Sequence, residues 1–87
     1  MKHAGRNALA SIALLLRILR RSPGLKERKP GVFYCKSKPF IHFHEDPAGV
    51  FAHMRTEIGW KRMRVSGRTE VAAFVAAAAS ELKRKPL

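Results

Sequence analysis

Both ends of the chain carry apolar residues at the spacing of an amphipathic helix. In residues 8–21 and in residues 69–85, an apolar position recurs every three to four residues and charged residues fall on other faces. The two stripes are Leu9, Ile12, Ala13, Leu16 and Leu19 in the first segment, and Val71, Phe74, Val75, Ala78 and Leu82 in the second. Ser22-Pro23-Gly24 ends the first helix, and Ser66 or Thr69 can cap the second. The pattern predicts one helix at each end.

The middle of the chain follows the shorter period of β-strands. Four runs bounded by turn residues, at about 32–35, 40–44, 50–54 and 60–65, are strand candidates, and the charged segment 25–29 is expected to link them to the first helix. Such short connections favour antiparallel pairing, because a parallel return needs a crossover of a dozen or more residues. The sequence therefore predicts a single α+β domain over residues 1–87, a two-layer sandwich in which a four-stranded antiparallel meander carries both helices on one face.

Alternation divides the strand residues between two faces of this sheet. The predicted core set is Phe33, Cys35, Ile41, Phe43, Val50, Ala52, Met54, Met63 and Val65, and the predicted uncovered set is Tyr34, Phe40, His42, His44, Phe51, His53, Trp60, Arg62 and Arg64. If residues 46–49 form a four-residue loop, His42 faces His53 and three histidines cluster on the uncovered face. If the third strand is turned over instead, His53 leaves the cluster.

Residues 40–47 place two histidines and two carboxylates within one strand and turn. Neutral imidazole is a common zinc ligand, and three histidines with an open fourth position suit a site that activates water. His42, His44 and His53 are therefore candidate metal ligands. The alternative is a set of solvent-facing histidines, or of histidines hydrogen-bonded to Glu45 and Asp46, which is the commoner outcome for a short motif.

Proton transfer between these histidines and carboxylates is a further hypothesis, because histidine titrates near neutral pH. Alternation places His44 and Glu45 on opposite faces, however, and Asp46 before Pro47 is typical of a turn. The chain has no phosphate-binding glycine loop and no serine or cysteine nucleophile in a recognisable setting. We therefore predict a binding protein rather than an enzyme, with no catalytic residues and no cofactor unless zinc is bound.

The charge of the chain favours an anionic partner. Lys and Arg number 18 against 6 Asp and Glu, which gives a net charge of +12 spread along the whole length. Aromatic rings stack on bases and arginines bind phosphates, so the uncovered face suits single-stranded DNA or RNA. The predicted nucleic-acid-binding residues are Tyr34, Phe40, Trp60, Arg62 and Arg64. Two alternatives are that the charges are merely solvated, and that the aromatic residues form a homodimer interface.

The sequence also bears on location. Cys35 is the single cysteine, so no internal disulfide can form and nothing favours an oxidising compartment. The apolar run Ala8–Leu16, which Arg17 interrupts, is shorter than the roughly 20 residues that span a bilayer. We therefore expect a cytoplasmic protein without a transmembrane segment.

Two segments of the central region carry a resemblance. Residues 24–34, GLKERKPGVFY, and 38–52, KPFIHFHEDPAGVFA, resemble a group of small bacterial proteins without an assigned activity, most closely at HFHED. The resemblance implies a bacterial, cytoplasmic origin. The predicted order of helix, antiparallel sheet and helix is more loosely similar to frataxin-like and YjbR-like proteins. A DNA-binding role has been supposed for YjbR-like proteins from their fold, whereas the acidic iron-binding first helix of frataxin has no counterpart in the basic segment 8–21.

Overall fold

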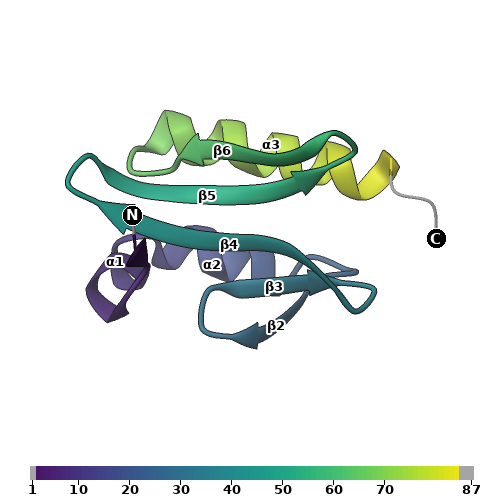
Figure 1. The fold of residues 1–87 in the computed structure, drawn as a ribbon, viewed down its shortest axis with the longest axis horizontal. Coiled ribbons are helices and arrows are strands. Elements are labelled where there is room, and N and C mark those ends of the chain that lie inside the picture. Colours follow the sequence, from purple (N-terminus) through teal and green to yellow (C-terminus); the bar gives the residue numbers. More distant parts are fainter. Residues whose placement is uncertain (1, 85–87) are drawn as a thin grey trace.

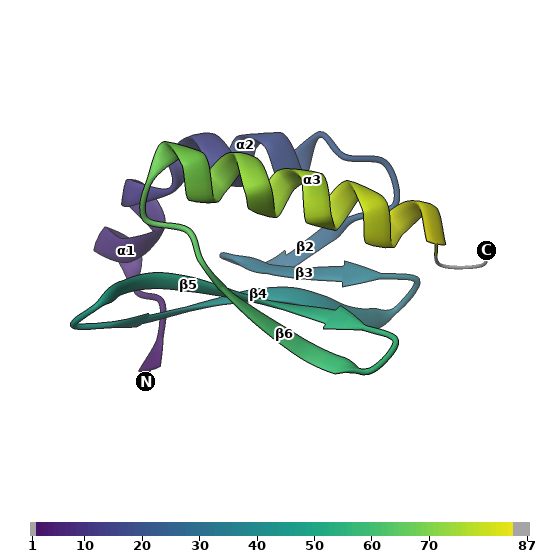
Figure 2. The ribbon, with the colours of Figure 1, turned by 90° about the horizontal axis from the view of Figure 1, so that it is seen from above.

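A computed structural model of the chain describes residues 2–84, which form an antiparallel sheet and three helices. The elements in chain order are β1 (Lys2–His3), α1 (Arg6–Ser11), α2 (Ala13–Arg20), β2 (Lys26–Lys29), β3 (Val32–Cys35), β4 (Lys38–Asp46), β5 (Gly49–Thr56), β6 (Gly59–Arg64) and α3 (Arg68–Arg84). Strands β2 to β6 pair in sequence order, each antiparallel to the next, and β1 pairs with β4. Helices α2 and α3 lie side by side over one face of this meander (Figures 1 and 2).

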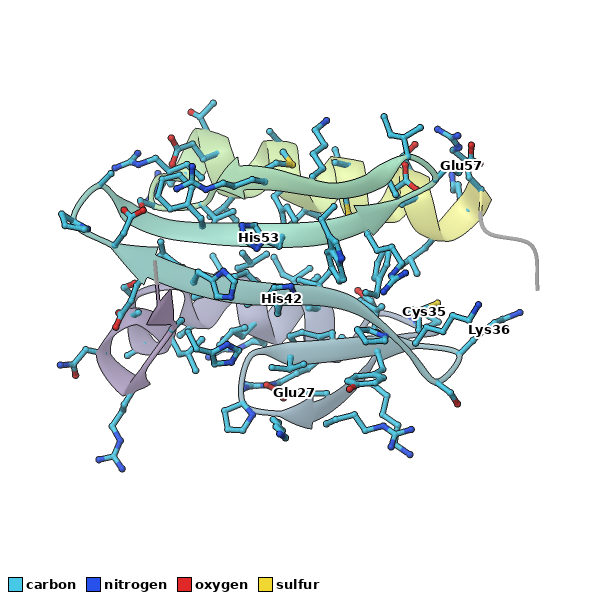
Figure 3. The ribbon with its side chains drawn as sticks, viewed as in Figure 1. Glu27, Cys35, Lys36, His42, His53 and Glu57 are labelled. Atoms are coloured by element: carbon cyan, nitrogen blue, oxygen red, sulfur yellow. The ribbon has the colours of Figure 1, made fainter. Side chains whose placement is uncertain are left out.

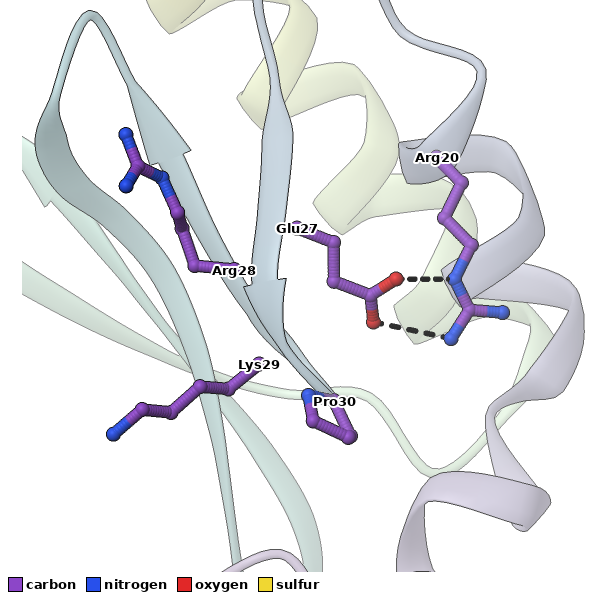
Figure 4. A pocket seen from close by; sticks show the side chains of 5 residues that line it. All are labelled: Arg20, Glu27, Arg28, Lys29 and Pro30. Carbon is purple, nitrogen blue, oxygen red and sulfur yellow. Dashed lines mark hydrogen bonds and ion pairs between the residues drawn. The ribbon is translucent and has the colours of Figure 1, made fainter.

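The α+β class and the antiparallel meander are confirmed, but the prediction of four strands is wrong. Strand β2 lies in the charged segment that was expected to be a link, and the two-residue β1 adds a further pairing. The Glu27 side chain reaches toward α2, where its carboxylate accepts hydrogen bonds from Arg20 Nε at 2.6 Å and Nη2 at 3.0 Å, and from the Gly31 backbone N–H at 2.9 Å (Figure 4). A polar edge strand held by an ion pair has no apolar alternation for sequence analysis to detect.

The first predicted helix is interrupted at Ile12, which ends α1 and precedes α2. Ile12 remains buried at the break, and the buried residues of the two helices are Ala8 in α1 and Leu15, Leu16 and Leu19 in α2. The prediction that Ala13 belongs to the buried stripe is therefore wrong, because the break turns α2 so that Leu15 packs inward and Ala13 is exposed.

The second predicted helix is confirmed as α3. Phe74 and Ala78 are buried, while Val71, Val75 and Leu82 pack against the core from its border. Lys85, to which the prediction extended this helix, lies outside the described residues.

The core lies between the helices and the sheet, where alternation placed it. Phe33, Ile41, Phe43 and Phe74 are at most 1% exposed, and the rings of Phe43 and Phe74 meet edge to face at 6.3 Å between centroids. Val50, Ala52, Met54 and Val65 complete the sheet side of the core, and Cys35 and Met63 pack against it while partly exposed. Burying such rings is the dominant stabilising contribution in a small domain.

Tight two-residue turns fix the register of the hairpins. Asp46 pairs with Gly49 across the β4–β5 turn, and the Asp46 carboxylate accepts a hydrogen bond from the Ala48 backbone N–H at 2.8 Å. From this turn the pairs run Glu45 with Val50, His44 with Phe51 and His42 with His53. The predicted orientation of the third strand candidate, which is β5, is confirmed. The alternative in which this strand is turned over and His53 leaves the cluster is wrong.

Phe40 departs from the predicted alternation. The register of β3 against β4 shifts between Phe33, which pairs with Ile41, and Tyr34, which pairs with Pro39. Phe40 falls at this bulge, is 1% exposed and belongs to the core cluster. Its prediction as an accessible nucleic-acid-binding residue is therefore wrong, because one extra residue in a strand breaks the period of two.

Candidate functional site: a histidine cluster on the open face

The sheet face opposite the helices, which we call the open face, carries the histidines. His42 and His44 lie on β4 and His53 lies on β5, where strand pairing sets His53 directly opposite His42. Figure 3 shows His42 and His53 side by side on these neighbouring strands. The hairpin brings together residues 11 positions apart, so the cluster depends on the β4–β5 register that the turn at residues 46–49 sets.

His3 joins the other histidines from the start of the chain. Strand β1 pairs with β4 so that His3 faces His44, and their ring centroids are 5.7 Å apart. All four histidines of the sequence therefore lie in one patch. The place of His3 beside the other histidines could not be predicted from the sequence, because a two-residue strand has no periodic pattern.

The ring nitrogens of His42, His44 and His53 converge. One nitrogen from each ring can be chosen so that all three lie within 4.8 Å of one another. His42 Nδ1 and His44 Nε2 are 3.2 Å apart, which allows a hydrogen bond with either ring as donor according to the tautomers. The centroids of the His44 and His53 rings are 4.5 Å apart, and the rings are nearly perpendicular at 88°. Among the described residues, no cysteine, aspartate or glutamate is part of this group.

The cluster holds its histidines in the neutral form. Burial lowers the pKa of His42 from 6.5 to about 4, and repulsion from His44, His53 and His3 adds to the effect. Burial is also the largest cause of the lowered pKa values of His44 and His53, and the nearby Arg62 guanidinium lowers both further. Neutral imidazoles keep a nitrogen lone pair, so they can accept a hydrogen bond or bind a metal ion without first losing a proton.

One nitrogen of the cluster lacks a hydrogen bond. His44 Nδ1 is buried and has no hydrogen-bonding partner among the described residues. A buried polar atom without a partner costs about 1–3 kcal/mol, and a bound ion or water is one explanation for such an atom.

Arginine and aromatic side chains surround the cluster. The Trp60 ring meets the His42 ring at 4.8 Å between centroids, and the Arg55 guanidinium lies 4.9 Å from the Trp60 ring centroid. The Arg62 guanidinium lies 3.9 Å from the centroid of Phe51 and pairs with Asp46 at 3.1 Å. The open face thus combines neutral imidazoles with stacked arginines.

The predicted nucleic-acid-binding residues are less concentrated than the histidines. Trp60 is 45% exposed, whereas the half-buried Tyr34 lies beside Arg28, with 5.2 Å from the guanidinium to the ring centroid. Arg64 turns toward the start of α3, where it pairs with Glu70 at 2.9 Å. It also donates a hydrogen bond to the carbonyl of Ala48 in the β4–β5 turn at 2.9 Å. Arg62 is the one predicted arginine that adjoins the histidines.

Glu45 of the HFHED run is separated from the imidazoles, as alternation predicted, and Asp46 lies at the turn. Glu45 is opposite Val50 on the helix side, where its Oε1 would lie 3.8 Å from a Cβ added at Gly5. Asp46 holds the turn and pairs with Arg62. The carboxylates therefore have structural roles here.

Comparisons of the chain with family models, with curated proteins and with solved structures gave no match. The resemblance to small bacterial proteins therefore stays a prediction. None of the helices within residues 2–84 is long and apolar enough to cross a membrane. The function of the protein has to be inferred from its fold and from the histidine cluster.

Proposed function

We propose that the protein binds a divalent transition-metal ion, with zinc as the reference ion, through His42, His44 and His53. The observation that carries this proposal is the convergence of three imidazole nitrogens within 4.8 Å on one hairpin. Imidazole is a ligand for zinc, copper and nickel, whereas calcium and magnesium prefer oxygen.

The spacing of the nitrogens suits a tetrahedral ion. Zinc–nitrogen distances of about 2.0–2.1 Å place two ligand nitrogens roughly 3.3 Å apart in a tetrahedral site. His42 Nδ1 and His44 Nε2 are 3.2 Å apart, which is close to this spacing. His53 lies within reach by a small side-chain rotation, because no pair of the three chosen nitrogens is more than 4.8 Å apart.

The protonation state also supports the proposal. A metal ion competes with protons for imidazole nitrogen, and ordinary histidines begin to lose this competition near pH 6.5. The lowered pKa values of His42, His44 and His53 extend metal binding to more acidic solutions.

Isothermal titration of zinc into the metal-free protein tests the proposal. The protein should carry no histidine tag, since a tag binds zinc itself. We expect one zinc ion per chain and a loss of affinity of more than about 100-fold in His42→Ala, His44→Ala or His53→Ala, because even partners outside the coordination shell contribute 10–100-fold. The matched control is His3→Ala, which removes an imidazole beside the group. Equal binding by all four variants would refute the site.

Nucleic-acid binding is a second candidate, and the distribution of charge on the sheet favours it. The open face carries three arginine–aromatic stacks, formed by Arg28 with Tyr34, Arg55 with Trp60 and Arg62 with Phe51. Four of the six acidic residues are paired elsewhere: Glu27 with Arg20, Glu57 and Glu81 with Arg84, and Glu70 with Arg64. A basic face with stacked planar groups suits single-stranded nucleic acid, whose phosphates and bases both find partners.

Titration of a fluorescently labelled oligonucleotide in the presence of a chelator tests this second function apart from the first. We expect affinity that falls steeply with salt and that falls further in Arg55→Gln, because this change removes a positive charge beside the exposed ring of Trp60. The control is Lys61→Gln, on the helix side of β6, where Lys61 lies near Glu57 and Glu81. Equal losses of affinity in Arg55→Gln and Lys61→Gln would show that the oligonucleotide binds through nonspecific charge alone. The bacterial origin, the cytoplasmic location and the homodimer alternative remain predictions of the sequence.

A further inference from the structure

The group of three histidines leaves a metal ion incompletely coordinated. A tetrahedral ion takes four ligands, and the described residues supply three, all of them imidazoles, which bind a metal ion in their neutral form. Glu45 follows His44 in sequence but faces the helix side, close to Gly5, so it is not placed to complete the shell. An ion bound here keeps its full positive charge and at least one position for an outside ligand.

The surroundings of this position are positively charged as well. Arg62 is paired with His53 across β5 and β6, and its guanidinium lies 3.9 Å from the ring centroid of Phe51, which is paired with His44 across β4 and β5. Asp46 pairs with Arg62 at 3.1 Å through Nη2, so its single negative charge offsets the guanidinium. A divalent ion held by neutral imidazoles keeps its own charge, which an anion would neutralise.

We propose that the open position of the metal, together with Arg62, binds a phosphate group of an outside ligand. This inference rests on the proposed metal site. A phosphate offers several oxygens in a tetrahedral arrangement, so one can bind the ion while others accept hydrogen bonds from a guanidinium. A terminal phosphate carries nearly two negative charges near pH 7, whereas a diester or a carboxylate carries one; both kinds of phosphate offer more oxygens than a carboxylate. Trp60, whose ring meets His42, offers a surface for whatever the phosphate carries.

Metal and phosphate binding must then reinforce each other. If phosphate raises the affinity for the metal by some factor, the metal raises the affinity for phosphate by the same factor, and such coupling is typically about 5–150-fold. Cobalt(II) is a suitable probe, because its visible absorption reports the number and type of its ligands. Methyl phosphate and dimethyl phosphate represent the two sources of the group: a terminal phosphate, and the diester linkage of a nucleic-acid backbone.

The experiment titrates cobalt(II) into the metal-free protein, first alone and then with each phosphate ester. We expect cobalt alone to bind through the histidines, and methyl phosphate to change the visible spectrum and to raise cobalt affinity by about tenfold or more. Bound cobalt should also broaden the phosphorus NMR signal of the ester, which shows that the phosphate lies close to the ion. If dimethyl phosphate has the same effect, the site accepts the diester linkage of a nucleic-acid backbone. If dimethyl phosphate has no effect, the site requires a terminal phosphate. Both results agree with the inference.

Arg62→Gln should lose most of the gain that methyl phosphate gives, while its cobalt affinity without phosphate rises because a neighbouring positive charge is gone. Lys61→Gln is the matched control, one residue away on the same strand but on the opposite side of the sheet, and it should behave like the unchanged protein.

The outcomes separate the two proposals. If cobalt binds through the histidines but methyl phosphate changes neither its spectrum nor its affinity, the phosphate inference is wrong and the metal site stands. If cobalt alone does not bind, the metal site itself is wrong. A gain that survives unchanged in Arg62→Gln would overturn the role of Arg62.

Discussion

The two faces of β4 differ in what their residues do, although the residues alternate within one short run. Ile41 and Phe43 are at most 1% exposed and pack under the helices, whereas His42 and His44 lie half-buried on the open face beside His53. The covered face stabilises the fold through apolar burial. On the open face, the paired strands hold three imidazoles close together, and burial keeps these imidazoles in the neutral form. The same strand therefore separates residues that stabilise the fold from the residues of the proposed metal site, and substitutions should separate the two effects.

The largest expected effect is on the covered face. Phe43→Ala should lower the free energy of unfolding by about 3–5 kcal/mol, because it removes a fully buried ring that packs against Phe74. Urea denaturation followed by circular dichroism measures this, with Phe43→Leu as a milder variant. The neighbouring His44→Ala should cost less than about 1 kcal/mol without metal. Equal losses at the two positions would remove the distinction between the faces.

The next effect should appear only when zinc is present. At a free zinc concentration 100 times the dissociation constant, the folded protein should gain about 2.7 kcal/mol of stability. His53→Ala should lose this gain and His3→Ala should keep most of it, since His53 is one of the three converging residues and His3 lies outside them. Denaturation curves with and without zinc provide the measurement. A full gain in His53→Ala would place the metal elsewhere.

Acid should lower the free energy of unfolding of the metal-free protein, because His42 on the open face is neutral when folded. The pKa of His42 is 6.5 when unfolded and about 4 when folded, so the unfolded chain binds more protons between these values. The free energy of unfolding is therefore highest above pH 6.5 and falls as the pH drops toward 4.

The matched variant is His42→Ala, which should show a shallower fall over the same pH range. The difference should be modest, because solvent screens a half-exposed ring. Stability measured by denaturation at a series of pH values tests this. An identical slope in the variant would mean that His42 is not held in its neutral form.

The smallest effect concerns the arginine stacks beside the cluster. Arg55→Gln should cost about 0.5–1 kcal/mol, the usual contribution of a guanidinium on an exposed aromatic ring. Trp60 is the single tryptophan, so its fluorescence reports the change directly. A loss as large as that of Phe43→Ala would show that the open face also stabilises the core.

Much of this difference between the faces could be predicted from sequence, because alternation and turn length are local properties. They placed Phe33, Ile41 and Phe43 inside and set His42 opposite His53, as the strand pairs confirm. Period-based prediction failed where tertiary structure decides the outcome. Phe40 is buried at a bulge that depends on how β3 pairs with β4. The position of His3 likewise depends on a pairing between distant segments.

Strand β2 also could not be predicted from periodicity, because an ion pair and strand pairing stabilise it. Its sequence, KERK, has no apolar periodicity, and it is stabilised by pairing with β3 and by the contact of Glu27 with Arg20 across the gap to α2. For the candidate site, the sequence predicted which histidines converge but could not predict that Arg64 would turn away toward Glu70 while Arg62 stayed beside them.

The most direct test of the metal site is long-range proton–nitrogen NMR of the histidine side chains during a zinc titration at neutral pH. We predict that one equivalent of zinc shifts the signals of the coordinating ring nitrogens of His42, His44 and His53 together, with a smaller change at His3. Ring nitrogen signals that stay unchanged at stoichiometric zinc would contradict it.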